Sequence, residues 1–467
     1  MGIMEYSKKP RIILVPYPAQ GHVTPMQKMA VTFLNLGFEP IMVLPQFIYN
    51  QIMIHNDEEN QQVKWVAIAD GLEKDTATDF FGIESAMENI MPSQLERLIQ
   101  ELQEEASKGG SGGEVVCVVV DLLASWSIQV AQKCGIVVAG FWPVMFAAYR
   151  LIESIPDMVR CGLISETGLP QHEGKFCSLP DFPVLDTEDL PWLIGTVAAK
   201  KARFKFWTRT LERSRTLKWL LMHTFPDETK LHSSPMTLLP LGYHFNYTQT
   251  NHASFWEEDK SCLEWLETQN PNSVVYISFG SWVSPIGEAK LKSLAMALEA
   301  SRRPFLWVLK KAWREGLPKG FEERVSKHQG RVVSWAPQME VLRHKSVACY
   351  LTHCGWSSTI EALWFKKKML CYPVAGDQSL NCAYIVQKWK VGMRLNGLGM
   401  KDVEEGLRMV MEDVEMESRL RKLHDTIIQK EDDLKKDLSL KAFVETLKKE
   451  ASYIAYAFNY VEGVDVL

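Results

Sequence analysis

The chain has 467 residues, 46% of them hydrophobic and 23% charged, which is enough for two sizeable globular domains. Its formal net charge of −5 argues against nucleic acid as a general partner, and no apolar run approaches the roughly 20 residues of a membrane span. Nine cysteines without a C-x-x-C pair, and an N-terminal apolar run too short for a signal peptide, predict a cytoplasmic protein with reduced thiols.

The first half of the chain alternates short apolar runs with helical patterns. Residues 11–15 (RIILV) predict a buried strand, and a Pro/Gly turn leads from it into an amphipathic helix over about 22–36. Further strands are predicted at 40–44 (PIMVL) and 115–121 (VVCVVVD). Strands that alternate with helices at this rhythm predict a parallel, doubly wound sheet.

The same rhythm restarts in the second half. Strands are predicted at 273–280, 305–309, 347–351 and 369–373, with a helix at 287–301. We therefore expect an α/β protein of two Rossmann-like domains that face each other across a cleft. The first is expected over 1–245 and the second over 246–450, and residues 451–467 form an extension for which the sequence shows no role.

The segment 335–378 is the most informative part of the chain. Its central strand, VACYL, runs into the turn THCGW and then into a helix start. A strand that ends in a His-x-Gly turn and opens a helix collects free N–H groups and the positive helix end at one point, which suits a phosphate or diphosphate. His353 can add a donor, Gly355 lets the backbone approach closely, and Ser358 can bond an oxygen.

Residues at both ends of this segment extend the prediction. Trp335 precedes Ala336-Pro337-Gln338, so an aromatic face that can stack on a base lies beside a second helix start. Asp377-Gln378 follow the strand at 369–373, at the strand's carboxyl end, where open α/β sheets bind ligands. An acid beside an amide suits a hexose. Base, diphosphate and sugar together predict a nucleotide sugar.

These residues also have plainer interpretations. Ser358-x-x-Glu361 is the pattern of a capping box, in which case both residues simply begin a helix. Cys354 and Trp356 can be ordinary core residues, and Trp335 can be a buried aromatic rather than a platform for a base.

The segment as a whole resembles the signature box of the plant secondary-product UDP-glycosyltransferases, and the resemblance covers residues 10–450. It implies the GT-B fold, with an acceptor-binding N-terminal domain and a UDP-sugar-binding C-terminal domain. It also implies that Trp335 stacks on uracil, the Ala336 main chain pairs with the base, Gln338 lies near the nucleoside, Glu361 binds the ribose, and Trp356, Asp377 and Gln378 hold the sugar. In that family a Gln at the last position of the box goes with glucose, so Gln378 favours UDP-glucose.

Four positions depart from the family's pattern. The usual Asn after the central Trp is Ser357, so one phosphate contact becomes shorter or water-mediated. A Thr common near the sugar's 6-hydroxyl is replaced by Pro143, which cannot donate. The usual Gly and Pro of a helix-to-strand turn are Lys366 and Lys368, in a run of three lysines that we expect to be a solvated helix end.

His22 and Asp121 are the candidates for a catalytic pair. His22 lies where the first predicted strand turns into its helix, and Asp121 ends the strand at 115–121. Sugar transfer to an alcohol needs a base for the hydroxyl proton, and an imidazole suits that task. A neighbouring carboxylate would fix its tautomer and stabilise the imidazolium. A lone His is more often structural, but the pair matches the family's catalytic His–Asp dyad.

The leaving nucleoside diphosphate must be stabilised as it departs. The chain contains no Asp-x-Asp motif of the kind that holds a divalent metal. Fixed donors are available instead: His353, Ser358, the helix start after Gly355, and the Gly280-Ser281 turn after the strand at 273–280. They predict a metal-independent reaction without a cofactor, and direct displacement predicts inversion at the anomeric carbon.

The acceptor pocket is expected among apolar residues of the N-terminal half. The candidates are Leu122, Trp142, Phe146 and Trp192, each of which can equally be a core residue. Such a pocket suits a hydrophobic phenolic or terpenoid. We therefore expect a monomeric enzyme that transfers glucose from UDP-glucose to a hydroxyl of a small hydrophobic acceptor. The alternative is a non-catalytic nucleotide-sugar-binding protein that acts through a protein partner.

Overall fold

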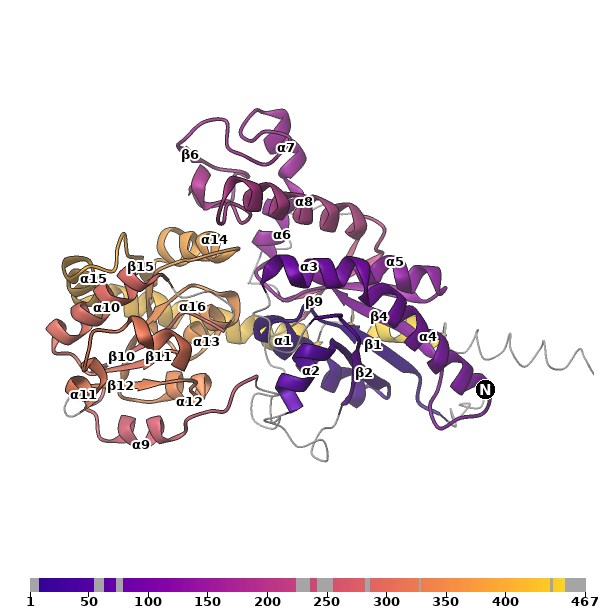
Figure 1. The fold of residues 1–467 in the computed structure, drawn as a ribbon, viewed down its shortest axis with the longest axis horizontal. Helices are drawn as coiled ribbons and strands as arrows, with labels where there is room; N and C mark the ends of the chain where they lie inside the picture. The colour runs from indigo at the N-terminus through magenta and orange to yellow at the C-terminus, as the bar shows by residue number, and fades with distance from the viewer. Residues whose placement is uncertain are drawn as a thin grey trace, which may run out of the picture. The chain divides into compact units, whose positions relative to one another are not determined.

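The structure is a computed structural model, and it describes residues 8–53, 63–72, 79–223, 236–241, 255–281, 286–326, 329–436 and 440–449 (Figure 1). These residues form two compact units, each with its own parallel sheet. Unit 1 comprises the described residues of Met1–Phe146, Arg209–Phe255 and Lys430–Leu467. Unit 2 comprises those of Ala147–Thr208 and Trp256–Gln429.

The sheet of unit 1 has the strand order β3-β2-β1-β4-β5-β8-β9 in the described ranges, and every pairing is parallel. Its strands are β1 (Arg11–Val15), β2 (Glu39–Pro45), β3 (Lys64–Ile68), β4 (Val115–Asp121), β5 (Val137–Trp142), β8 (Trp219–His223) and β9 (Thr237–Leu241). Strands β1 and β4 are buried along their whole length. This agrees with their continuous apolar runs, because helices cover both faces of a parallel sheet.

Amphipathic helices pack around this sheet (Figure 1). They are α1 (Gln20–Asn35), α2 (Gln46–Met53), α3 (Phe80–Asn89), α4 (Met91–Ser107) and α5 (Trp126–Lys133), with the 3-10 turn η2 (Leu122–Ala124). In α4, Leu95, Ile99 and Leu102 recur at helical spacing and are buried, whereas Gln100 and Glu101 are exposed. The buried face accounts for the packing of α4 beside α3 and α5.

A helix over residues 440–449 also belongs to unit 1. The ring of Phe443 lies edge-on to Trp219 of β8, with the ring centroids 5.5 Å apart, and Lys448 Nζ lies 5.7 Å from the ring centroid of Phe38. From the sequence we expected this stretch in the second domain, whereas the compact units assign it to unit 1. The helix packs on unit 1 through the contact between Phe443 and Trp219, which lie more than two hundred residues apart in the sequence. A local sequence pattern cannot predict such a contact.

The sheet of unit 2 has the order β12-β11-β10-β13-β14-β15 in the part that the structure describes, again with parallel pairings. Its strands are β10 (Val274–Ser278), β11 (Phe305–Val308), β12 (Gly330–Val333), β13 (Val347–Thr352), β14 (Lys368–Cys371) and β15 (Gly392–Arg394). Buried aliphatic and aromatic side chains of β10, β11 and α10 form its core, including Ile277, Leu294 and Trp307.

The remaining elements complete the chain. Around the second sheet lie α9 (Ser261–Glu267), α10 (Glu288–Ser301), η5 (Lys311–Gly316), α11 (Phe321–Ser326), α12 (Gln338–Arg343), α13 (Trp356–Trp364), α14 (Gln378–Ala383), the π-helix η6 (Tyr384–Lys388), α15 (Met400–Glu412) and α16 (Val414–Lys436). Helices α10 and α15 lie side by side (Figure 1). Among the described helices, none is both long and apolar enough to cross a bilayer.

Residues 147–208 pack with unit 2, although the sequence analysis placed them in the first domain. Their elements are α6 (Phe146–Glu153), α7 (Ile155–Arg160), a hairpin of β6 (Lys175–Phe176) and β7 (Leu185–Asp186), η3 (Thr187–Asp189) and the start of α8 (Val197–Ser214). Asp189 forms a bidentate ion pair with Arg394 at 2.9 and 3.0 Å, and Val184 and Gln387 exchange two hydrogen bonds. Both links join the segment to the η6–β15 region.

The lysine run at 366–368 is not the solvated helix end that we expected. Lys366 is exposed, but Lys367 is buried and its Nζ donates to the carbonyls of His344 and Val347 at 3.1 and 2.7 Å. Lys368 Nζ donates to main-chain carbonyls at the end of α15, at 2.7 Å for Asp413. Two of the three ammonium groups therefore satisfy orphan carbonyls inside unit 2.

Candidate functional site

Both candidate centres lie where the strand order of a sheet reverses. In unit 1 the chain runs outward from β1 through β2 to β3 and then returns to β4, on the other side of β1. In unit 2 it runs from β10 through β11 to β12 and returns to β13, beside β10. Ligands of open α/β sheets bind at the carboxyl ends of the strands at such a point.

The centre of unit 1 is a hydrogen-bonded imidazole–carboxylate pair. His22 is the third residue of α1, which follows β1, and its Nδ1 lies 2.7 Å from Oδ2 of Asp121, the last residue of β4. Asp121 has no exposed surface, and its Oδ1 accepts a hydrogen bond from the main-chain N–H of Leu123 at 2.9 Å. An ionised carboxylate only accepts, so Nδ1 of a neutral His22 carries the proton and Nε2 keeps its lone pair.

The centre of unit 2 is built around a neutral, buried histidine. His353 follows β13, and a Cβ atom placed on either Gly280 or Gly355 would overlap its Nε2. The ring thus fits between two turns because the residue of each turn that faces it is a glycine. Burial lowers the pKa of His353 to about 4, so the ring is uncharged at neutral pH and offers one N–H donor.

The helix start beside His353 is open to an anion. Gly355 is the N-cap of α13, and no side chain caps it. Ser358 is therefore the third residue of the helix and not its cap, which rules out the capping-box interpretation. Ser357 is exposed, and its side chain makes no hydrogen bond with any described residue. The first N–H groups of α13 have no partner within the helix, so they suit phosphate oxygens.

Gln338, the first residue of α12, orders the neighbouring polar residues. Its Nε2 donates to Ser358 Oγ at 3.0 Å and to Glu361 Oε2 at 2.7 Å. Its Oε1 accepts from the hydroxyls of Tyr276 and Tyr350 at 3.1 and 3.0 Å, and the two phenol rings stack. Gln338 is consequently fixed on both sides and holds the Glu361 carboxylate in place.

Trp335 borders a hollow in unit 2. The residue is half-buried, and its ring lies 4.6 Å from that of Trp256 at a tilt of 39°. The hollow is lined by Phe279, Gly280, Leu309, Lys310, Trp313 and Trp335, among others. Trp335 is therefore not a fully buried core residue, and it shares this hollow with the Gly280 turn.

Asp377 ends the loop after β14 as the N-cap of α14, and Gln378 is the first residue of that helix. Asp377 Oδ2 accepts from Asn381 Nδ2 at 2.7 Å, and the same nitrogen donates to the Cys354 carbonyl at 2.9 Å. Gln378 Oε1 accepts from the main-chain N–H groups of Val374 and Ala375, both at 2.9 Å. Its amide nitrogen makes no hydrogen bond within the described ranges, so the group that Gln378 can offer a ligand is a donor.

Comparisons with known proteins identify the family of the chain. The family model described as UDP-glucoronosyl and UDP-glucosyl transferase matches residues 214–432. The chain is 53% identical over 463 residues to UDP-glycosyltransferase 82A1 of Arabidopsis thaliana, which covers 93% of this chain and 98% of that protein. The chain belongs to the plant UDP-glycosyltransferase family. It is also 29% identical to 7-deoxyloganetin glucosyltransferase of Catharanthus roseus, over 86% of this chain and 88% of that protein.

Solved structures of plant UDP-glycosyltransferases share the fold. Os79 from O. sativa in complex with UDP superposes with a TM-score of 0.75 at 23% identity, over 94% of this chain and all of that one. A UDP-glucose: anthocyanidin 3-O-glucosyltransferase in complex with UDP gives a TM-score of 0.71 at 22% identity, over 96% of this chain and all of that one. The expected GT-B fold is thereby confirmed, and the protein is a UDP-dependent glycosyltransferase.

The residues expected at the acceptor are all buried in this glycosyltransferase. They are Leu122, Trp142, Phe146 and Trp192, none more than 1% exposed. The indole N–H of Trp142 donates to the Met145 carbonyl, and that of Trp192 donates to the Gly168 carbonyl, at 2.9 and 2.7 Å. Trp192 also belongs to unit 2. The core interpretation accounts for their surroundings, and a part in acceptor binding stays a prediction.

Trp356 is a further residue whose surroundings are those of a core. It opens α13, is 3% exposed, and lies 6.5 Å from Trp389, ring centroid to ring centroid. Trp389 in turn packs on Tyr384 of η6, at 5.6 Å. The indole thus anchors the first turn of α13, and the main-chain N–H is the part of Trp356 that this helix start can offer a ligand.

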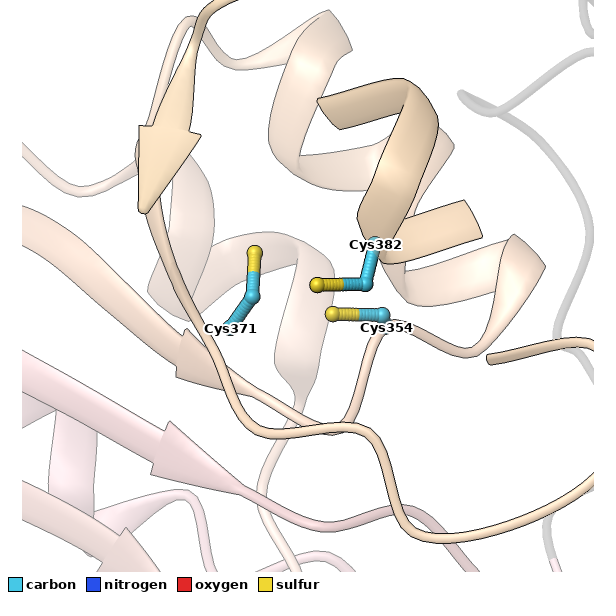
Figure 2. A group of neighbouring side chains, drawn as sticks. All are labelled: Cys354, Cys371 and Cys382. Carbon is cyan, nitrogen blue, oxygen red and sulfur yellow. The ribbon is translucent and has the colours of Figure 1, made fainter. Parts of the chain in front are cut away.

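Three cysteines gather beneath the His353 turn (Figure 2). Cys354 comes from the turn itself, Cys371 from the end of β14 and Cys382 from α14, and their sulfur atoms lie within 4.8 Å of one another. Among the described residues this is the one cluster spaced to hold a metal ion. All three are buried, and burial raises the pKa values of Cys354 and Cys371. Hydrogen bonds from the Cys354 and Cys371 thiols lower the pKa of Cys382. Buried cysteines pack as small apolar side chains, and we interpret the cluster as core.

Several residues that hold the candidate site residues in place by hydrogen bonds were not predicted from the sequence. Tyr276 and Tyr350 fix Gln338, and Asn381 ties Asp377 to the Cys354 turn. The spacing of Asp377 and Asn381, four residues apart on a helix, was a usable signal. The contact between Tyr276 and Gln338 joins a strand to a distant helix, and no sequence spacing reveals it.

Proposed function

We propose that this glycosyltransferase transfers glucose from UDP-glucose to a hydroxyl of a small hydrophobic acceptor, with inversion and without a metal ion. The observation that carries the proposal is the hydrogen bond between His22 and Asp121 at the reversal point of the first sheet. The buried Asp121 carboxylate holds His22 in one tautomer, and the His22 side chain stays 14% exposed. A histidine with a purely structural role would require neither feature.

The proposed base is Nε2 of His22. The acceptor's O–H donates to this atom, and the oxygen attacks the anomeric carbon as the bond to UDP breaks. His22 takes the proton and becomes an imidazolium, which the Asp121 carboxylate stabilises through the Nδ1–H bond. A single displacement on the face opposite the departing diphosphate inverts the anomeric centre. The products are a glucoside, UDP and a proton that His22 passes to solvent.

The donor is proposed to lie along the carboxyl edge of the second sheet. Uracil stacks on Trp335 and pairs with the Ala336 main chain, and the ribose hydroxyls bind Glu361, which Gln338 orients. The diphosphate meets donors that need no metal: His353, Ser357, Ser358, the Gly280–Ser281 turn and the first N–H groups of α13.

The sugar is proposed to be glucose, held by Asp377, by the free amide nitrogen of Gln378 and by the turn at Trp356. Gln378 lies next to Asp377 in the chain. Neighbouring hydroxyls of the sugar could therefore accept from the Gln378 amide nitrogen and donate to the Asp377 carboxylate. The name of the relative 7-deoxyloganetin glucosyltransferase supports the choice of glucose.

The chemical class of the acceptor and the cellular location of the enzyme are proposed from the ligands of solved relatives and from the cysteines of this chain. Solved relatives are described with a trichothecene and with pterostilbene as ligands, which supports a small hydrophobic acceptor of terpenoid or phenolic type. All nine cysteines fall in the described ranges and are free thiols, which supports a reducing, cytoplasmic location. A monomer that needs no protein partner suffices for this chemistry.

The test is turnover of the purified protein with UDP-glucose and a panel of phenolic and terpenoid alcohols. We expect a β-glucoside by the coupling constant of its anomeric proton, and no change of rate in EDTA. His22→Ala should lower turnover by about 10²–10⁴-fold, the scale of general-base catalysis, with UDP binding unchanged. An α-glucoside, a rate that EDTA abolishes and Mg²⁺ restores, or full activity of His22→Ala would each contradict the mechanism.

A further inference from the structure

Lys310 lies at the carboxyl edge of the second sheet, two residues beyond β11. Its Nζ donates to the main-chain carbonyl of Ser281 at 2.6 Å. Strand β10, which leads into the Gly280–Ser281 turn, pairs directly with β11. Lys310 therefore ties together the loops that follow two neighbouring strands, one of which is the proposed phosphate turn.

The same ammonium group lies on aromatic faces next to the proposed base platform. Nζ is 4.1 Å from the ring centroid of Trp256 and 5.0 Å from that of Trp313. Trp256 in turn packs against Trp335. Lys310 and Trp335 also line one hollow, of whose described lining residues Lys310 is the charged one.

The charge of Lys310 has no anionic partner in the part of the chain that the structure describes. The charged or titratable groups on neighbouring segments are Glu257, Glu258, Glu288, Lys290, Lys311, Arg314, Glu315 and His353, and Lys310 forms an ion pair with none of them. The residues at 282–285, which the structure does not describe, contain no acid in the sequence. A carbonyl and two ring faces compensate a desolvated ammonium incompletely, and a diphosphate would complete that compensation.

We propose that Lys310 is a donor-binding residue whose ammonium group holds the Gly280–Ser281 turn and neutralises charge on the diphosphate of the nucleotide. The proposal rests on the proposed function, because it needs a uridine nucleotide seated on Trp335. An ammonium has three N–H donors, and Ser281 uses one. The remaining donors are available to phosphate oxygens without displacing the carbonyl that shapes the turn.

The first experiment separates the diphosphate from the nucleoside. Lys310→Met keeps the apolar stem and removes the charge, and calorimetry then measures its binding of UDP and of uridine. We expect UDP affinity to fall about 10–100-fold and uridine affinity to change less than about twofold, since only UDP carries the anion. Lys310→Arg should restore most of the UDP affinity. The matched control is Lys290→Met, which removes another lysine that lies on a ring in unit 2, that of Tyr372, and should alter neither affinity.

Equal losses for UDP and uridine would mean that Lys310 supports the aromatic platform, and unchanged UDP affinity would mean that it contributes nothing; either result overturns the proposal. Thermal melting of each variant distinguishes loss of binding from loss of folding. Failure of the proposed function looks different, because the wild-type protein would then form no glucoside while its binding of UDP and uridine could still be compared with that of Lys310→Met.

The second experiment uses pH. Burial lowers the pKa of Lys310 to about 8. UDP prefers the protonated lysine and its own terminal phosphate is fully ionised above about pH 7, so UDP affinity should be constant from about pH 7 up to that pKa and should decline as pH rises toward about 9. Lys310→Met should show no such decline. The neighbouring charged groups are the same in both proteins, so their titration appears in both curves and cancels. Parallel curves for the two proteins would overturn the proposal.

Discussion

Replacement of Asp121 by Asn tests the catalytic pair through the hydrogen bonds that it makes. Asp121 accepts from two donors, Nδ1–H of His22 and the N–H of Leu123. An Asn at this position has one acceptor oxygen and one donor amide for the same two partners. If its oxygen keeps the Leu123 bond, its amide donates to Nδ1, and the proton of the imidazole moves to Nε2. That tautomer has no lone pair at the position of the proposed base.

The magnitude follows from these bonds. The active tautomer requires the Asn amide to face the Leu123 N–H, which leaves a buried donor unsatisfied at a cost of about 1–3 kcal/mol. Loss of the charge-assisted bond to the imidazolium costs about 1.5–3 kcal/mol more. Together they lower turnover by about 10²–10⁴-fold, and the effect of Asp→Asn in the Ser-His-Asp triad lies at the upper end of this range. In Asp121→Ala neither tautomer of His22 is favoured by a hydrogen bond at Nδ1. Turnover should therefore fall less in Asp121→Ala than in Asp121→Asn.

The assay is initial rate of glucoside formation for both variants, with UDP affinity measured separately by calorimetry. UDP affinity should not change, because the proposed donor residues belong to unit 2 and Asp121 to unit 1. The matched control is Asp79→Asn, which alters a carboxylate that caps α3 through Gly82 N–H and should leave turnover unchanged. Turnover of Asp121→Asn within about threefold of the wild-type rate, or a lower rate for Asp121→Ala than for Asp121→Asn, would contradict this role of Asp121.

Three further predictions concern unit 2. Ser357→Asn adds a longer donor at the exposed second position of α13 and should lower the KM for UDP-glucose by up to about tenfold; an unchanged KM would mean that this position does not meet the phosphates. Lys366→Gly should raise the free energy of unfolding by about 1 kcal/mol, measured by urea denaturation, because Lys366 has a φ of 54° just after α13, where glycine has no steric cost. Gln378→His should shift initial rates from UDP-glucose toward UDP-galactose with the inhibition constant for UDP unchanged, and it should lower the melting temperature, because an imidazole accepts only one of the two loop N–H groups that Gln378 Oε1 accepts. Equal loss of UDP affinity would place Gln378 in the nucleotide site instead.

The strands were predictable from the sequence because burial on both faces leaves a continuous apolar run. The strands at 11–15 and 115–121 were found with their observed bounds. Helix α1 starts two residues earlier than predicted. Its N-cap is Ala19, which is not one of the residues that typically cap a helix, so the sequence gives no signal for the start. The bounds of the two units could not be predicted, because the Arg394–Asp189 pair that draws 147–208 into unit 2 joins charges about two hundred residues apart.

The candidate site was predictable where chemistry coincides with a strand end. His22, Asp121, His353 and Asp377 each follow or end a buried strand, and the sheet brings the first two within hydrogen-bonding distance. The alternative interpretation of Ser358-x-x-Glu361 as a capping box is wrong, because Gly355, which has no side chain, is the N-cap of α13. The supporting network of Tyr276, Tyr350 and Gln338 is tertiary, so it emerges only when the strands are placed side by side.

The interleaving of the two units along the chain limits how such enzymes can be recombined. Unit 2 is made of two separate stretches, 147–208 and 256–429, and unit 1 includes the helix at 440–449. A single crossover near residue 255 would therefore exchange the proposed donor residues but separate Asp189 from Arg394 of the same chain, and would bring a foreign terminal helix against Trp219. A chimera that exchanges donor preference with a relative needs four junctions, so that each unit is inherited with all of its own segments.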